Sequence, residues 1–464
     1  MLGEGDLLAV ALTCRALRNA AQAVVRSAKA RRRRRSQIFH TSRRAIACSP
    51  ARLVWGRALG APCDSATCEA AAGFGGVEVL EALVGHGARP DTRSLVAAAS
   101  VGSVEALQWL LARGCELHVS VTTAAAEAGH LHACQFLRLK GCGWDEQTSA
   151  AAAGGGHLEV LRWALETKKL PADERAPARA AGSGHLHVLC WLRARGVSWD
   201  RSTCESAARG GHTEVLRWLR GAHPPCAWDA AVLAAAARAG KAETVRWLHS
   251  QGCPANAAAL EGSALNGDLE LTRWLHARGV PIGAATCAAA AQGGHLPVLR
   301  WLRAEGCAWD GSTIREAAGG GWVEVLVWAV EGGCACDSMA HAHACKRGHV
   351  PVLRFLASHE LPRSPRASKM AAVGGHVEVL EWLEADGCLR LDEDVLGSAA
   401  YMGNLEAVQF LRSRGCPWTK YTLLSAMAPG HWHVVEWLRA NGCPSPAPRD
   451  LLSLTSRVSS DLRY

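Results

Sequence analysis

The sequence predicts an all-α solenoid of about fourteen helix–turn–helix repeats, and two observations carry this prediction. A short sequence motif recurs fifteen times along the chain, and eleven of its copies are centred on a tryptophan. Successive copies lie 27 residues apart in eleven of fourteen steps, 28 in two and 29 in one. A fixed period of about 20–50 residues is typical of units that bury their apolar faces against their neighbours. The central residues, called anchors below, are Trp55, Ala82, Trp109, Phe136, Trp163, Trp191, Trp218, Trp247, Trp274, Trp301, Trp328, Phe355, Trp382, Phe410 and Trp437.

Each copy of the motif predicts two helices and a loop. An alanine-rich first helix ends at a Gly-Gly or Gly-His pair, because glycine tolerates the left-handed conformation of a helix end. The second helix carries apolar residues at anchor positions −3, −2, 0 and +1, which form one inward stripe and make the anchors part of the core. A second glycine and a short loop then lead to the next repeat. Six aspartates stand at the expected N-cap of a first helix, namely Asp64, Asp91, Asp145, Asp200, Asp310 and Asp337.

These repeats resemble ankyrin repeats. The family pattern T-P-L-H-x-A-A, then G-H-x-E-V-V-x-x-L-L, is matched by Thr203, Ala207-Ala208 and the run from Gly211 to Leu219. The period is shorter than the family's of about 33, and the resemblance implies that the projecting β-hairpin fingers are missing. Such short, Trp-rich repeats look like the ankyrin arrays of algal and large-DNA-virus proteins. The Gly-His pair recurs at His130, His157, His185, His212, His295, His349, His376 and His431.

The array occupies residues 48–445, and the segments around it differ in charge. Residues 1–60 hold 13 Lys+Arg and 2 Asp+Glu, whereas the remaining 404 residues hold 38 and 40. Nucleic acid is therefore expected to bind only through the head, at the basic run Arg31–Arg35 within a linker over residues 29–47. That run could equally be a nuclear-localisation signal or a solvated linker. Residues 446–464 are expected to form a C-terminal cap or tail.

Residues 1–28 resemble the second half of an F-box. The run from Asp6 through Val10 and Cys14 to Arg18 is similar to a D-L-x-x-x-x-x-V-C-R-x-x-R segment, although the L-P-x-E-L-L half is absent. The resemblance implies docking on the adaptor subunit of a cullin–RING ubiquitin ligase. The alternative is an amphipathic cap on the first repeat. The missing half would mean either that the encoded chain starts late or that the box is degenerate. The docking residues would be Leu7, Leu8, Leu12 and Leu17.

No constellation of residues predicts catalysis, and we expect no enzyme activity, no cofactor and no metal site. There is no phosphate-binding loop, nucleophile elbow or HExxH motif. The stretch from Cys334 to His349 is rich in Cys and His, but its spacing matches no closed zinc site. The Gly-His histidines recur too often to be catalytic and are expected to hydrogen-bond the turn. Eight cysteines share one loop position, too far apart for disulfides between neighbouring repeats, and this usage favours a reducing compartment.

The loop tryptophans are the candidate contacts for a protein partner. They lie where the family's finger would project, and tryptophan is enriched in binding hot spots. Alternatively, each could pack on the first helix of its own or the next repeat. The five residues are Trp144, Trp199, Trp228, Trp309 and Trp418.

Together these observations predict a non-enzymatic protein-binding module. The partner is expected on the concave face formed by the first helices, and the favoured role is the substrate receptor of an F-box-type ubiquitin ligase. A plain scaffold and a nuclear or polyanion-binding protein are the alternatives. We expect a monomer in the cytoplasm or nucleus. No run approaches the ~18–20 apolar residues of a membrane span.

Overall fold

The computed structural model describes residues 47–50, 52–54, 63–74, 76–168, 170, 172–223 and 225–445. Within these ranges all regular structure is helical, and the α-helices follow one another as fourteen pairs. The predicted all-α solenoid of helix–turn–helix repeats is thus confirmed. The anchor Trp55, linker residues 29–46, the F-box-like segment and the predicted C-terminal cap or tail over 446–464 lie outside the described residues.

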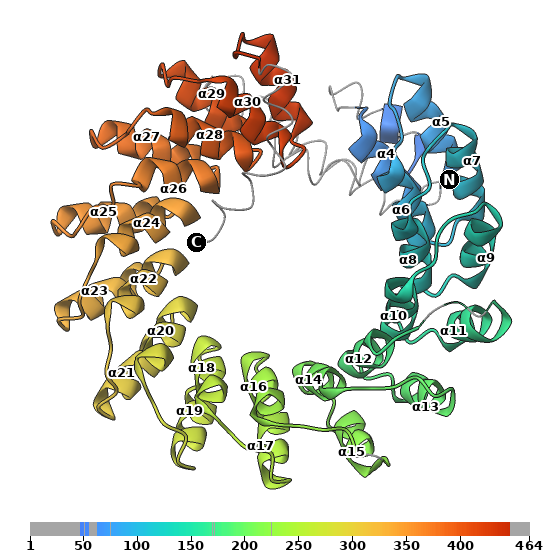
Figure 1. Cartoon of the computed structure of the whole chain (residues 1–464), viewed down its shortest axis with the longest axis horizontal. Helices are drawn as coiled ribbons and strands as arrows, with labels where there is room; N and C mark the ends of the chain where they lie inside the picture. The colour runs from blue at the N-terminus through green and yellow to red at the C-terminus, as the bar shows by residue number, and fades with distance from the viewer. Residues whose placement is uncertain are drawn as a thin grey trace, which may run out of the picture. The chain divides into compact units, whose positions relative to one another are not determined.

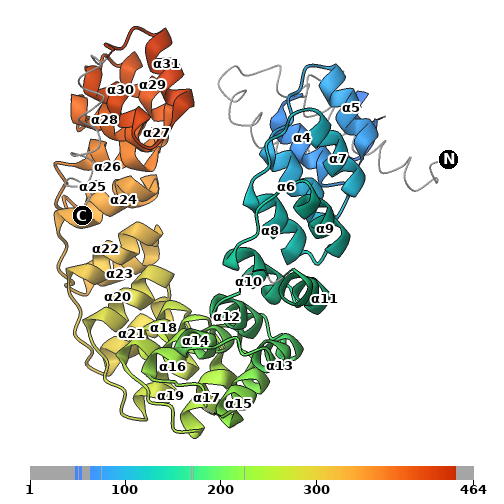
Figure 2. The same cartoon turned by 45° about the vertical axis from the view of Figure 1, so that its right-hand side comes forward.

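The chain divides into two compact units, residues 1–207 with 214–227, and residues 208–213 with 228–464. The repeat made by α14 and α15 contributes residues to both units. In each unit the even-numbered first helices form one row and the odd-numbered second helices form another (Figures 1 and 2).

The first seven of these pairs are, in chain order, α4 (Ser65–Ala72) and α5 (Val77–Gly85), α6 (Thr92–Ser100) and α7 (Val104–Ala112), α8 (Val119–Glu127) and α9 (Leu131–Leu139), α10 (Glu146–Gly154) and α11 (Leu158–Arg162) continued by a π-helix η1 (Trp163–Thr167), α12 (Arg175–Gly182) and α13 (Leu186–Ala194), and α14 (Arg201–Gly210) and α15 (Thr213–Gly221), followed by α16 (Ala230–Arg238) and α17 (Ala242–Ser250).

The next seven pairs are α18 (Ala257–Leu265) and α19 (Leu269–His276), α20 (Ala284–Gly293) and α21 (Leu296–Ala304), α22 (Gly311–Gly320) and α23 (Val323–Glu331), α24 (Ser338–Arg347) and α25 (Val350–Ser358), α26 (Ala367–Gly374) and α27 (Val377–Ala385), α28 (Glu393–Tyr401) and α29 (Leu405–Ser413), and α30 (Lys420–Met427) and α31 (Trp432–Ala440).

The first helices start and stop as the residue types require. All six predicted aspartates accept a hydrogen bond from the backbone of the first turn; Asp145 Oδ1, for example, lies 2.8 Å from the Thr148 nitrogen. Such caps satisfy N–H groups that have no partner within the helix. The turn that follows contains a glycine at positive φ, as in Gly129 at 80° and Gly321 at 82°. The N-cap aspartates and the turn glycines therefore both mark helix boundaries, as the sequence predicts.

The core differs from the prediction in one respect. In the helix that carries Trp301, the residues Val298, Leu299 and Leu302 are fully buried, whereas Trp301 itself is half-buried and packs against the core from its edge. Every described anchor shares this half-buried state. An indole is large and is seldom enclosed completely, so it covers the join between repeats while smaller aliphatic groups fill the centre. The described anchors point inward, as predicted. They are only half-buried, however, so the prediction that they are core residues was wrong about how deeply they are buried.

Candidate binding surface and the contacts between repeats

The loop tryptophans pack inside the array. Each meets the anchor of the repeat that it opens, ring edge against ring face, with centroids 5.2 to 6.4 Å apart. These ring contacts are made with a second helix, and Trp144 also makes the expected contact with a first helix, through Ser149 of α10. The pairs are Trp144 with Trp163, Trp199 with Trp218, Trp228 with Trp247, Trp309 with Trp328, and Trp418 with Trp437.

Burial separates one of these tryptophans from the others. Trp144 is buried, and its indole N–H donates to Ser149 Oγ at 2.9 Å. The other four are half-buried. An indole of this kind still offers an edge to a ligand. A role of the loop tryptophans in binding stays a prediction, but any such role would be added to a structural one.

An arginine covers the second face of several loop tryptophans. Arg193, Arg303 and Arg412 lie with their guanidinium carbons 4.2, 4.3 and 3.9 Å from the ring centres of Trp199, Trp309 and Trp418. Each arginine precedes its tryptophan by six residues, a spacing that was not predicted to matter from the sequence. A guanidinium over an indole face is stabilised by the ring quadrupole.

The loop tryptophan takes space that other repeats give to a side chain four residues after the anchor. In the repeat of Trp328 that residue is Gly332, where an added Cβ would lie 2.7 Å from the Trp309 ring. Where no loop tryptophan arrives, a cation stacks on the anchor instead, as Arg113 does on Trp109 at 3.4 Å. An arginine likewise lies over Trp191 and over Trp274, whereas Phe355 packs against His359.

The turn histidines hold neighbouring repeats together. His130, His157 and His349 place Nε2 at 3.1, 3.0 and 2.9 Å from backbone carbonyl oxygens about thirty residues earlier, near the end of the preceding first helix. A carbonyl only accepts, so Nε2 must carry the proton. The contact crosses to the previous repeat, whereas the sequence suggested a bond within the turn. At the same position the indole N–H of Trp322 donates to the Gln292 carbonyl at 2.8 Å.

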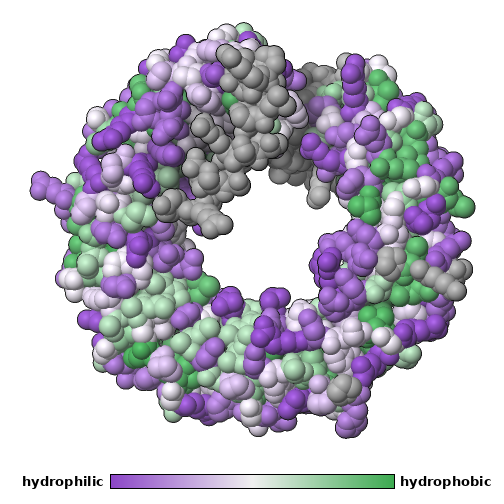
Figure 3. Space-filling model, in the orientation of Figure 1, coloured by the Kyte–Doolittle hydropathy of each residue, from purple (hydrophilic) through white to green (hydrophobic). Residues whose placement is uncertain are grey.

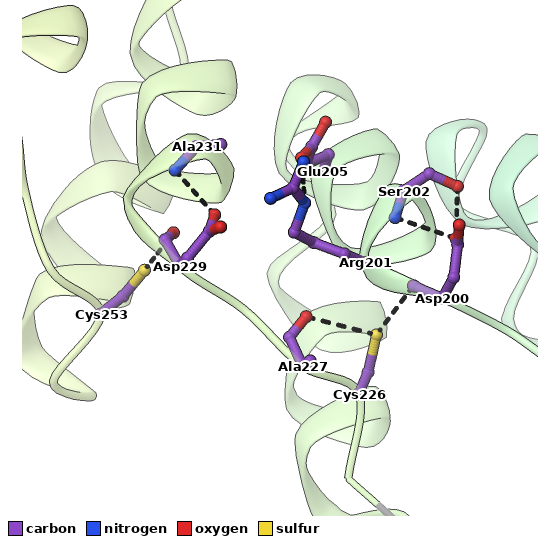
Figure 4. A network of polar contacts seen from close by, with 9 residues as sticks. All are labelled: Asp200, Arg201, Ser202, Glu205, Cys226, Ala227, Asp229, Ala231 and Cys253. Carbon is purple, nitrogen blue, oxygen red and sulfur yellow. Dashed lines mark hydrogen bonds and ion pairs between the residues drawn. The ribbon is translucent and has the colours of Figure 1, made fainter.

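The loop cysteines make a second recurring contact, which joins the loop at the end of a repeat to the first helix of the same repeat. Cys226 Sγ lies 3.2 Å from the Asp200 carbonyl oxygen, and Cys253 Sγ lies 3.3 Å from that of Asp229 (Figure 4). The acceptor is the N-cap residue of the first helix in the repeat that the loop closes. The same contact is made by Cys142, Cys307, Cys334, Cys416 and Cys443, whereas Cys115 contacts the carbonyl of Pro90, which precedes the N-cap Asp91.

The Cys and His side chains between Cys334 and His349 do not come together at one site. Cys334 Sγ contacts the Asp310 carbonyl, and His349 contacts the Gly319 carbonyl. Only His341 and Cys345 meet, with Nδ1 and Sγ 3.5 Å apart on one face of α24. Within the described ranges no three Cys, His, Asp or Glu residues are placed to hold a metal ion. His341 is 2% exposed, and its Nε2 has no hydrogen-bond partner.

The outward surface of the first helices varies from repeat to repeat. The seventh and eighth residues after the N-cap are buried and nearly always alanine, as in Ala317 and Ala318. The fifth residue after the N-cap is half-buried in most repeats and changes in charge, for example Glu205, Glu261 and Arg315. The buried positions therefore serve stacking, and the variable positions are available to other molecules.

The solved structures to which the chain is similar share little sequence with it. No family model matches the chain, and no curated protein does. Among solved structures, the human ASB11 ankyrin repeat domain is 20% identical, with 40% of this chain and 99% of that chain covered and a TM-score of 0.31. The pentatricopeptide repeat protein PPR10 in complex with an 18-nucleotide psaJ RNA element is 14% identical, with 90% and 75% covered and a TM-score of 0.32. The structure of the pentatricopeptide repeat protein PPR10 from maize is 13% identical, with 84% of this chain and 75% of that chain covered and a TM-score of 0.26. No helix among the described residues has the length and hydropathy to cross a membrane.

Proposed function

We propose that this protein is a non-enzymatic scaffold that holds a protein partner on the outward surface of its first helices. The observation that carries the proposal is the contrast between uniform buried positions and variable half-buried ones on the same helices. A solenoid needs the uniform positions for stacking. Charges that change from Glu261 to Arg315 along one row are the kind of feature that gives a partner its register and specificity.

The recurring polar side chains support a binding role over a catalytic one. The turn histidines are engaged with backbone carbonyls of neighbouring helices, and the N-cap aspartates with backbone N–H groups. Groups engaged in this way stabilise the array and are not placed to attack a substrate. Hydrophilic and hydrophobic residues are interspersed over the visible surface (Figure 3), as in many non-obligate interfaces.

The test compares two faces of the same unit. Glu261→Arg with Arg315→Glu alters the first-helix surface, whereas Arg273→Glu with Glu324→Arg makes a matched change on the second helices. Proximity labelling in the native cell would identify partners of the wild-type chain, and pull-downs would measure each variant. We expect the first variant to lose the partner and the second to keep it, with equal helicity by circular dichroism. Loss only in the second variant would contradict the proposal.

We further propose that the head gives this scaffold a link to a ubiquitin ligase. The F-box-like residues Leu7, Leu8, Leu12 and Leu17 support this by their resemblance alone, because they lie outside the described residues. Weak or no adaptor binding is expected with half a box, and binding should appear when the missing half is restored in front of Met1. It should be abolished by Leu8→Asp with Leu12→Asp. If the chain with the added half does not bind the adaptor, the link to a ubiquitin ligase is contradicted and the proposal reduces to a scaffold without it.

The strong positive charge of the head favours a second candidate function, binding of a polyanion. It too would act through residues outside the described ranges, the run Arg31–Arg35. Salt-sensitive binding of nucleic acid that disappears when residues 29–35 are deleted would support it.

A further inference from the structure

Two repeats carry a cysteine at each of two positions that the fold brings together. Cys287, four residues after the N-cap of α20, lies with its sulfur 3.4 Å from that of Cys307 in the loop after α21. These side chains are 0% and 2% exposed. Cys204 on α14 and Cys226 occupy the same two positions, and the Cys204 thiol hydrogen-bonds to Cys226.

Neighbouring repeats supply a built-in control for this arrangement. Cys334 occupies the loop position one repeat after Cys307 and makes the same contact with an N-cap carbonyl. The residue facing it from the first helix is Ile314 instead of a cysteine. Cys416 is likewise paired in position with Leu396. The loop position therefore exists with and without a cysteine facing it from the first helix of the same repeat.

The second thiol changes the chemistry of the first. A hydrogen bond from Cys287 lowers the pKa of Cys307, and one from Cys204 lowers the pKa of Cys226. Burial instead raises the pKa of Cys334 and of Cys416 to about 11. The thiolate is the reactive form of cysteine, so the loop sulfur of each pair is the better nucleophile.

We propose that Cys287 with Cys307, and Cys204 with Cys226, are two redox modification sites that each close to an intramolecular disulfide in response to a hydroperoxide. The loop thiolate attacks the peroxide O–O bond, and the cysteine becomes a sulfenic acid as hydroxide (for H₂O₂) departs and takes up a proton. The helix thiol then attacks that sulfur and expels water. Two thiols and one H₂O₂ thus give one disulfide and two waters.

The geometry suits this step. The sulfurs of Cys287 and Cys307 need to approach by a little over about 1 Å to reach bonding distance. Their burial means that the loop must open locally before peroxide enters, and a small oxidant needs only a small opening. The disulfide would fasten the loop to the first helix of the same repeat and would replace the Cys307 contact with the Gly283 carbonyl.

The experiment follows each thiol of the reduced full chain during treatment with H₂O₂. Remaining thiols are alkylated in denaturant, and peptides are quantified by mass spectrometry without reduction. We expect peptides linking Cys287 to Cys307 and Cys204 to Cys226. Free Cys307 should disappear roughly tenfold or more faster than Cys334, because reactivity follows the thiolate fraction. Equal rates, or oxidation of Cys307 without a link to Cys287, would overturn the proposal.

Two variants test the cause. Cys287→Ala should slow the loss of Cys307 to the rate of Cys334. Ile314→Cys should give Cys334 the partner that it lacks and produce a new linked peptide in that repeat. Fast loss of Cys307 in Cys287→Ala would show that exposure, and not pairing, controls the reaction. The wild-type comparison of Cys307 with Cys334 remains decisive if a variant fails to fold.

Discussion

Two neighbouring repeats of the second unit, residues 310–336 and 337–363, have the same backbone plan but different interiors. Their first helices α22 and α24 have ten residues each, their second helices α23 and α25 have nine, and Asp310 and Asp337 cap them alike. Both also reach back to the preceding repeat, through Trp322 and His349. The hydrogen bonds at helix ends and turns are thus common to the two repeats.

The interior of the second repeat departs from that of the first at several positions, including those of Ile314 and Cys334. His341 stands where the first repeat has Ile314, and Leu361 stands where it has Cys334. The helices are nevertheless stacked in the same way. We infer that the backbone of a repeat is set by its turns and by its neighbours, and that core side chains decide how stable it is.

The largest expected effect comes from removing the turn glycine that the two repeats share across their join. Gly321 has φ of 82°, and an added Cβ would lie 2.7 Å from His349 Nδ1. Gly321→Ala should cost about 3 to 4 kcal/mol, because the left-handed residue is strained and the His349 hydrogen bond is displaced. Denaturant unfolding measures the loss, and limited proteolysis should place it in residues 310–363.

Gly333→Ala is the matched control. Gly333 has φ of 75°, but no atom lies within 4 Å of an added Cβ. Only the backbone strain of about 1 to 2 kcal/mol applies there. An equal loss at the two glycines would show that the turn histidine does not stabilise the join.

The next largest effect concerns His341 and depends on pH. Burial, with a smaller contribution from Arg363, lowers the pKa of His341 to about 4, below its unfolded value of about 6.5. The unfolded state then binds more protons between these values, so stability is full above pH 6.5 and is lost as pH falls toward 4. The loss should reach up to about 3 kcal/mol. Unfolding curves at pH 7 and 4.5 measure it.

His341→Leu should remove this pH dependence, since Leu396 and Leu423 occupy the same position in other repeats. It should also raise stability at pH 7 by about 1 to 3 kcal/mol, because a buried imidazole nitrogen without a partner is lost. The groups nearest His341 are Cys345 on α24 and Arg363, which is paired with Asp386. An unchanged pH profile in His341→Leu would assign the dependence to that ion pair.

A smaller effect is expected at the loop tryptophan that opens the first repeat. Trp309→Ala removes the contacts with Trp328, Arg303 and Gly332. We expect a loss of about 2 kcal/mol from one aromatic pair and one cation–π contact. Phe355 in the second repeat is stacked on His359 instead, with ring centres 4.2 Å apart, and His359→Ala is the control with the smaller loss. Loss of partner binding without loss of stability would instead support a purely binding role for Trp309.

The features predicted well from sequence are those that depend on the residues of a single repeat. Helix boundaries follow from local residues, such as Asp310 at the start of α22 and the glycine that ends it. The period predicts stacking, and the apolar stripe predicts Val298, Leu299 and Leu302 as buried.

Most features that the sequence did not predict depend on the neighbouring repeat. The acceptor for His349 is thirty residues away, and nothing in the Gly-His pair indicates which carbonyl faces it. The burial of the Trp301 side chain depends on the spacing between two helices, which the apolar stripe of one helix does not specify. The pairing of Cys287 with Cys307 could have been found by aligning the repeats and asking which positions share a chemistry.

The smallest expected effect is a gain. Glu360 has φ of 53° and stands where the first repeat has Gly333. It is the only described residue other than glycine with positive φ. Gly333 shows that this position has no neighbour within 4 Å of a Cβ, so the cost of a side chain here is backbone strain alone. Glu360→Gly should therefore stabilise the repeat by about 1 kcal/mol, reduced by the greater freedom of glycine in the unfolded chain. Thermal unfolding measures the gain, and Glu360→Asn, which tolerates the left-handed region, should give part of it. A loss in both variants would mean that the Glu360 side chain makes a stabilising contact that outweighs the strain.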